Sequence, residues 1–172
     1  MNEIFTVYYD SPIGMLSING REDAVLSILF DEEQEQAVPP DENTPYPVRE
    51  CYLQLDEYFK GNLKDFNFPY RMEGTPFQKS VWKGLTIIPY GQTWSYKDLA
   101  VHVGNEKAVR AVGTTNSKNQ LSIVVPCHRV IGSNGKLTGY AGGVWRKEWL
   151  LNHEKKNFTS TKEGINLSLM NN

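Results

Sequence analysis

The sequence predicts an α/β fold of the α+β kind, in which a small antiparallel sheet with one helix precedes a mostly helical domain. Three observations support this: β-rich patterning fills the first 30 residues, helical spacing dominates from residue 75 onward, and charge differs between the two parts. Residues 1–74 carry 5 basic and 15 acidic residues, whereas residues 75–156 carry 12 basic and 4 acidic residues. We therefore expect a sheet domain with its linker over 1–74, a second domain over 75–156 and a polar tail over 157–172.

The overall composition is that of a globular chain of 172 residues, 40% hydrophobic and 22% charged. No apolar run approaches the roughly 18 residues of a membrane helix, and no secretory signal is visible. The two cysteines, Cys51 and Cys127, exclude a disulfide-rich scaffold and argue against a structural zinc cluster. The default expectation is a cytoplasmic protein with no membrane partner.

The N-terminal elements follow from short β-branched and aromatic runs. Strands are expected at 5–9, 15–18 and 24–30, with Asn19-Gly20 as a hairpin dipeptide. Residues 47–60 then show helical spacing, and one face gathers the apolar side chains of Val48, Cys51, Tyr52, Leu55, Tyr58 and Phe59. Cys51 is therefore expected to be a buried core thiol.

The second half contains the signals of several helices. Thr75-Pro76 is typical of a helix start, and Ser95 with Asp98 resembles an N-terminal capping pair. After Gly104-Asn105 a further helix is expected over 106–112. This order predicts a helix-turn-helix, and the positive charge of the region favours a nucleic-acid partner. Plain helix packing and chance segregation of surface charge are the alternatives.

The chemistry-bearing residues follow a short apolar run. The β-branched run at 123–125 predicts a buried strand, and Pro126-Cys127-His128-Arg129-Val130 comes directly after it. A cysteine beside a histidine is a candidate nucleophile with a base, although contact between the two side chains needs a turn or a bridging water. Taken alone, such a dipeptide is more often a buried cysteine beside a surface histidine.

The residues that follow favour the catalytic interpretation. Small residues over 138–143 surround Tyr140 and can line a slot for a flat ring. Residues 145–151 predict a final helix that runs into Glu154, whose carboxylate could orient His128 as the third member of a triad. A solvated carboxylate at the helix end is the alternative for Glu154.

Together these residues resemble the O6-alkylguanine-DNA alkyltransferases, the methylated-DNA–protein-cysteine methyltransferase family. The similarity follows one order through Thr75-Pro76-Phe77-Gln78, Gly91, Ser95-Tyr96, Gly104-Asn105, Ala111-Val112-Gly113, Asn119, Pro126-Cys127-His128-Arg129-Val130, Gly139-Tyr140, Gly142-Gly143 and Lys147-Glu148-Trp149-Leu150-Leu151. It covers about half of the chain, and the N-terminal similarity to the family's ribonuclease-H-like domain is weaker.

The resemblance implies DNA repair by direct, irreversible and stoichiometric transfer of an alkyl group from O6-alkylguanine in double-stranded DNA, after nucleotide flipping. It implies a single-turnover enzyme without a cofactor, acting as a monomer. Activity on O4-alkylthymine is left open. Some relatives bind zinc in the N-terminal domain, but this chain has one cysteine and no histidine before residue 75, so we expect no metal.

The resemblance also implies a role for each matching residue. Cys127 corresponds to the alkyl acceptor, His128 to the base that takes its proton through a water, and Glu154 to the carboxylate that holds the imidazole. Asn119 corresponds to a hinge between the helix-turn-helix and the active-site turn, and Tyr96 to a donor to the departing guanine near the 3′ phosphate.

The remaining implied positions bind DNA or the flipped base. Arg110 corresponds to a finger that fills the gap left by the extruded nucleotide, and the other implied DNA contacts are Ser95, Tyr96, Ala108 and Arg129. The implied guanine pocket consists of Val130, Tyr140, Ala141 and Lys147. Ala141 stands where many relatives carry serine, which removes a hydroxyl contact. Ser122 stands where some carry proline, which leaves the tolerance for bulky alkyl groups open.

Three other functions remain open. A cysteine hydrolase using Cys127, His128 and Glu154 would turn over many times. A non-catalytic lesion-binding relative would lack the acceptor, and the presence of Cys127 argues against it. A plain helix-turn-helix regulator would not explain the motif at residues 126–130 or the Gly-rich slot.

Overall fold

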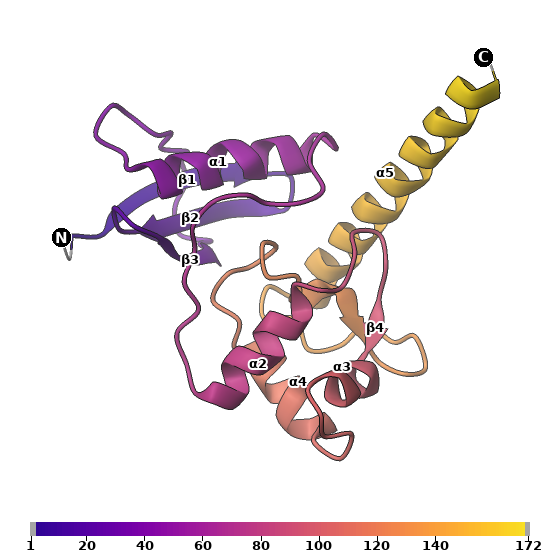
Figure 1. Cartoon of the computed structure of the whole chain (residues 1–172). Coiled ribbons are helices and arrows are strands. Elements are labelled where there is room, and N and C mark those ends of the chain that lie inside the picture. Colours follow the sequence, from indigo (N-terminus) through magenta and orange to yellow (C-terminus); the bar gives the residue numbers. More distant parts are fainter. Residues whose placement is uncertain (1–2, 171–172) are drawn as a thin grey trace.

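The N-terminal part is a three-stranded antiparallel sheet with a helix across one face (Figure 1). The computed structural model describes residues 3–170, and the side chains as far as residue 158. The strands lie in the order β1 (Phe5–Ser11), β2 (Gly14–Gly20), β3 (Val25–Phe30), and the helix is α1 (Tyr46–Phe59). The apolar face predicted for this helix is buried through Val48, Cys51, Leu55, Tyr58 and Phe59.

The second hairpin turns later than Asn19-Gly20, so that prediction is wrong. Both residues belong to β2, where the register against β3 shifts. The turn is closed by the Arg21 N–H, which donates to the Ala24 carbonyl at 2.9 Å. The Asn19 carboxamide instead donates to Ser27 Oγ on the neighbouring strand at 3.1 Å, which keeps Asn19 in the sheet.

The second part is mostly helical, as predicted, and contains α2 (Pro76–Leu85), α3 (Tyr96–His102) and α4 (Val109–Ser117). Capping boxes open two of these helices, with Thr75 and Gln78 at α2 and Ser95 and Asp98 at α3. The helix expected over 106–112 begins only at Val109 and runs on to Ser117. A turn delays its start, because the Ala108 N–H donates to the Asn105 carbonyl at 3.0 Å.

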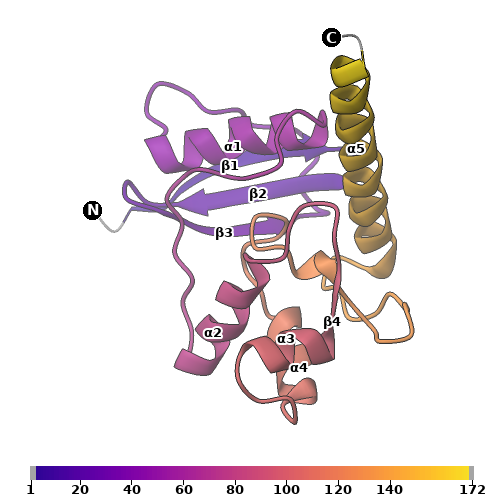
Figure 2. The same cartoon turned by 45° about the vertical axis from the view of Figure 1, so that its right-hand side comes forward.

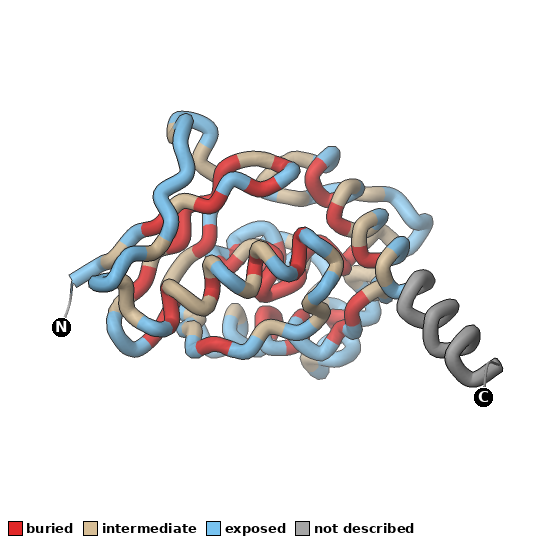
Figure 3. Tube along the Cα trace, turned by 90° about the horizontal axis from the view of Figure 1, so that it is seen from above, coloured by how far each residue is buried: buried red, intermediate tan, exposed pale blue. Residues whose placement is uncertain are grey.

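A long helix, α5 (Val144–Met170), passes beside one end of the N-terminal sheet (Figure 2). The segment 157–172 that the sequence sets apart as a tail therefore continues this helix as far as Met170. Buried positions lie in the sheet, in the helices and along the first turns of α5 (Figure 3). Within residues 3–170, no helix combines the length and apolar character needed to span a membrane.

The two parts share one core and are joined by backbone hydrogen bonds. The edge strand β3 reaches the segment after α4, where Ile28 N–H donates to the Gln120 carbonyl at 2.8 Å and Ser122 N–H donates to the Ile28 carbonyl at 3.2 Å. The N-terminal sheet is thus bonded directly to the residues that precede Cys127.

Candidate active site

The segment before Cys127 is a buried turn and not the predicted strand. Ile123 has a φ of +73°, and Val125 N–H bonds the Leu121 carbonyl at 3.0 Å while Cys127 N–H bonds the Val125 carbonyl at 2.8 Å. The β-branched pattern at 123–125 reports burial alone, since Ile123 and Val125 are almost fully enclosed. The turn is followed directly by a short 3₁₀ helix, η1 (Cys127–Arg129), which carries Cys127 and His128.

Asn119 fixes this turn from its position just after α4. Its buried carboxamide donates to the carbonyls of Val125 (2.8 Å) and Leu121 (3.3 Å) and accepts from Leu121 N–H (3.0 Å). Asn116, in the last turn of α4, donates to the Cys127 carbonyl at 3.3 Å. No pattern in the sequence identifies Asn116 as part of the site, because only the folded turn brings the Cys127 carbonyl within its reach.

The two cysteines differ in access and in charge environment. Cys51 is fully enclosed on α1, and burial raises the pKa of its thiol well above the usual value. Cys127 retains 8% exposure. Burial also raises the pKa of the Cys127 thiol, but a hydrogen bond from Asn119 and the positive charge of Lys147 oppose the rise. Cys127 is therefore the better nucleophile of the two.

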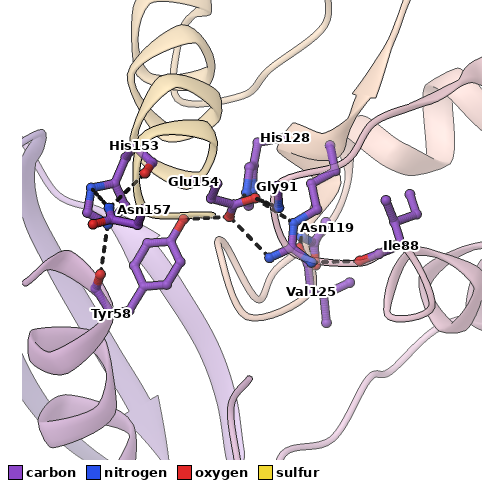
Figure 4. Close-up of polar contacts among 10 residues, drawn as sticks. Tyr58, Ile88, Gly91, Asn119, Val125, His128, His153, Glu154 and Asn157 are labelled. Carbon is purple, nitrogen blue, oxygen red and sulfur yellow. Dashed lines mark hydrogen bonds and ion pairs between the residues drawn. The ribbon is translucent and has the colours of Figure 1, made fainter. Parts of the chain in front are cut away.

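The carboxylate of Glu154, buried on α5, gathers side-chain donors from two segments, η1 and α1 (Figure 4). His128 Nε2 lies 2.7 Å from Oε2, Arg129 Nε lies 2.8 Å from Oε1, and the Tyr58 hydroxyl donates to Oε2 at 2.6 Å. Burial alone would raise the pKa of Glu154, yet its bonds and charge interactions with His128 and Arg129 hold it well below the ordinary range. Glu154 is therefore an ionised acceptor and not a solvated helix end.

This carboxylate selects the tautomer of His128. Since a carboxylate only accepts, His128 Nε2 carries the hydrogen, and burial lowers the pKa of the imidazole so that the ring is neutral near pH 7. The other ring nitrogen, Nδ1, is then a free base. It is buried and has no hydrogen-bond partner among the described residues.

The expectation that Arg129 contacts DNA is wrong. Its side chain is only 6% exposed, and its guanidinium bonds both Glu154 oxygens and the Ile88 carbonyl at 2.7 Å. Tyr58, by contrast, belongs to this network and was predicted only as core. Its helical spacing reports burial, and no local signal reveals that its hydroxyl meets a carboxylate 96 residues away.

A groove of about 450 Å³ runs between α4 and the Gly-rich loop, and it is lined by Tyr96, Val109, Arg110, Gly113, Thr114, Ser117, Thr138 and Gly139. Two side chains fix its loop wall: the Tyr96 hydroxyl donates to the Thr138 carbonyl at 3.1 Å, and Lys147 Nζ donates to the same oxygen at 2.7 Å. This brings two of the predicted residues, Tyr96 and Lys147, onto one carbonyl.

The other predicted pocket and binding residues lie around this groove. The strand β5 (Val130–Ile131) pairs in parallel with β4 (Trp94–Ser95), which places buried Val130 beside the start of α3. Tyr140 is half-buried and Ala141 exposed on the Gly-rich loop. Ser95 caps α3, Ala108 lies at the N-cap of α4, and Arg110 is exposed on α4.

Among the side chains described, no group of three His, Cys, Asp or Glu residues is arranged to hold a metal ion. The site instead combines a thiol, a neutral imidazole with a free nitrogen, a buried carboxylate and an adjoining groove. Such a set can deprotonate the thiol and direct it at an electrophilic carbon.

Comparison with known proteins gives consistent matches over both parts. Residues 76–156 match the family described as 6-O-methylguanine DNA methyltransferase, DNA binding domain, and residues 4–72 match its ribonuclease-like domain. The chain is 47% identical over 157 residues to the methylated-DNA–protein-cysteine methyltransferase of Methanosarcina barkeri, covering 88% of this chain and 99% of the relative.

Solved structures agree with these sequence matches. The crystal structure of Mycobacterium tuberculosis O6-methylguanine methyltransferase has a TM-score of 0.79 at 40% identity, covering 90% of this chain and 94% of that one. A structure from the same organism in complex with DNA has a TM-score of 0.78 at 42% identity, covering 88% and 93%.

Proposed function

The chain belongs to the 6-O-methylguanine DNA methyltransferase family, and on that premise we propose that Cys127 accepts the alkyl group. It is a methylated-DNA–protein-cysteine methyltransferase that repairs O6-methylguanine. One observation carries the assignment of Cys127: the adjacent His128 is fixed by Glu154 in the tautomer that leaves Nδ1 as a base. Cys51 has no such partner and is fully enclosed.

The proposed reaction is a displacement at carbon. The Cys127 thiol passes its proton through a water to His128 Nδ1, and the developing imidazolium is stabilised by Glu154. The sulfur then bonds the alkyl carbon as the bond from that carbon to guanine O6 breaks. The Tyr96 hydroxyl, which donates to the Thr138 carbonyl in this structure, would turn from that carbonyl to donate to the departing guanine. The charge of Lys147 raises the share of thiolate.

The partner in this proposal is double-stranded DNA that carries O6-alkylguanine. A base inside a duplex cannot present its O6 substituent to the buried sulfur, so the nucleotide must be flipped into the groove, which costs a few kcal/mol. Arg110 lies exposed on the rim of that groove and would fill the vacated stack. Ser95, Tyr96 and Ala108, at the N-termini of α3 and α4, would contact the phosphates.

Stoichiometry tests the proposed function. With excess DNA containing O6-methylguanine, the protein should gain one methylene (about 14 Da) and then stop, because a thioether is a poor leaving group. Intact mass measurement gives the number of groups, and peptide mapping should place the group on Cys127 and not on Cys51. Loss of O6-methylguanine beyond one equivalent would identify a turning-over hydrolase and refute the proposal.

Arg110→Ala should slow transfer from duplex DNA by about tenfold or more. The variant loses the side chain that fills the vacated base stack and so offsets the free energy of flipping. Reaction with free O6-benzylguanine, which needs no flipping, should stay within about twofold of the unmodified protein. The slope of the logarithm of the DNA-binding constant against the logarithm of salt concentration should change by only about one unit. Lys107→Ala is the matched control, because it removes an exposed cation of the turn before α4 and leaves the Arg110 side chain in place. Equal slowing on both substrates would show that Arg110 does not act on the base stack.

Lys147→Met should slow the reaction of Cys127 with iodoacetamide several-fold at pH 7 and move the midpoint of its pH profile upward. Burial lowers the pKa of Lys147 to about 8, so the ammonium is still mostly charged at pH 7, where it favours the thiolate. Lys118→Met, at an exposed lysine after α4, should leave the profile in place. An unchanged midpoint in Lys147→Met would remove Lys147 from the proposed mechanism.

A further inference from the structure

We propose that Arg146 is a positioning residue through which the N-terminal sheet domain fixes the wall of the guanine pocket. This inference rests on the proposed function, because it assigns a role toward the same pocket. It adds a residue that neither the family resemblance nor the sequence pattern singled out.

Arg146 lies in the first turn of α5, and its side chain is only 6% exposed. Its Nε donates to the Ile13 carbonyl, in the turn between β1 and β2, at 2.7 Å. Its Nη1 donates to the Gly142 carbonyl, in the Gly-rich loop, at 2.9 Å. One guanidinium thus joins the N-terminal domain to the loop that carries Tyr140 and Ala141.

The surroundings leave little room for another arrangement. The Arg146 guanidinium lies over the Phe30 ring, 4.2 Å from its centroid. At Gly14, with φ of +120°, an added Cβ would lie 2.8 Å from Arg146 Nη2. At Gly142, an added Cβ would lie 2.8 Å from the Tyr140 ring and 3.0 Å from the Phe30 ring. The absence of a side chain at Gly14 therefore makes room for the Arg146 guanidinium, and its absence at Gly142 makes room for the Tyr140 and Phe30 rings.

The positive charge of Arg146 is stabilised mainly by hydrogen bonds to backbone carbonyls and by contacts with aromatic rings. The nearest carboxylate, that of Glu32, lies 3.5 Å away and is 81% exposed. Enclosing a guanidinium this way carries a desolvation penalty, and its short bonds go to two carbonyls of different domains. What those bonds determine is the position of the Gly142 carbonyl, and hence of the pocket wall formed by Tyr140 and Ala141.

The test compares a reaction that needs the guanine pocket with a reaction that needs only the Cys127 thiol. Arg146→Met keeps much of the side-chain volume but loses both donors. Its saturable reaction with free O6-benzylguanine should be at least about tenfold less efficient, mainly through weaker binding of the base, because small displacements in a site have large kinetic effects. Iodoacetamide, which does not use the pocket, should alkylate Cys127 within about twofold of the normal rate.

Two further variants make the result specific. Arg146→Lys retains the charge but not the planar fork, so it should restore part of the efficiency. Arg71→Met is the matched control, since it removes an arginine whose ion pair with Asp23 is exposed, and it should leave both reactions unchanged. If Arg146→Met does not fold, Phe30→Leu takes its place, because that ring packs under Arg146 and against Tyr140.

The outcomes separate this inference from the proposed function. If the unmodified protein transfers no alkyl group to Cys127, the proposed function fails. If the unmodified protein reacts with O6-benzylguanine, or with free O6-methylguanine where the benzyl group does not fit, and folded Arg146→Met reacts with the same base at the same efficiency, the role of Arg146 is refuted. Equal slowing with both reagents would also refute it, because it would indicate general damage to the site.

Discussion

Cys127→Ser should transfer no detectable methyl group from DNA while it still binds duplex DNA. A serine hydroxyl loses its proton far less readily than a thiol, so His128 Nδ1 has no accessible nucleophile to generate. DNA affinity should remain, because Cys127 is almost enclosed and is not among the residues that line the groove. Intact mass after incubation with methylated DNA measures the first expectation, and a gel-shift titration measures the second.

Cys51→Ser is the matched control for this loss. Cys51 lies in the core of the N-terminal domain, so its replacement should lower stability but leave one transferred group per folded chain. Substantial transfer by Cys127→Ser, or loss of transfer confined to Cys51→Ser, would overturn the assignment of the acceptor.

Glu154→Gln should reduce both stability and transfer. The neutral amide leaves the buried Arg129 without its counter-charge, and removing one partner of a buried ion pair costs about 3–5 kcal/mol. It also removes the group that fixes His128, so transfer should slow by about 100-fold or more. Urea unfolding gives the stability change, and single-turnover kinetics under folded conditions give the rate. Tyr58→Phe is the milder control, because it removes one donor to the same carboxylate and should cost about 1 kcal/mol.

The same carboxylate predicts how stability depends on pH. The folded state holds the pKa of Glu154 well below the ordinary value of about 4.3, so its contribution is complete above that pH and is lost as pH falls further. Burial lowers the pKa of His128 in the folded state, so the unfolded state takes up a proton first as pH falls. His128 therefore also lowers the free energy of unfolding below about pH 6.5. The free energy of unfolding should thus fall on acidification, and below about pH 4.3 the fall should be shallower in Glu154→Gln. Equal slopes there would show that Glu154 is not the ionised acceptor.

Local signals made much of this molecule predictable from its sequence. The capping residues Thr75 and Ser95 begin helices where expected, and the apolar spacing of α1 identifies its buried face. The family motif brought together Cys127, His128 and Glu154, and the structure places the last two 2.7 Å apart.

The errors arise where side-chain contacts that form only in the folded chain override the local pattern. The run at 123–125 has strand composition, yet the Asn119 carboxamide bonds the Val125 carbonyl, and Val125 N–H bonds the Leu121 carbonyl within the turn. Arg129 has the charge of a DNA contact, but Glu154 lies close enough to bind it inside the protein. Tyr58, Asn116 and Arg146 act through partners that are distant in sequence or lie in a turn no pattern predicts.

The bonds between the two parts bear on the design of chimaeras. The Tyr58 hydroxyl from α1 completes the donors of Glu154, and Ile28 of β3 bonds the residues before the acceptor turn. The linker near residue 75 is therefore a poor crossover point, because exchange there would separate interlocking contacts that evolved in one polypeptide. Recombined repair proteins should instead inherit the facing surfaces of both halves from a single parent.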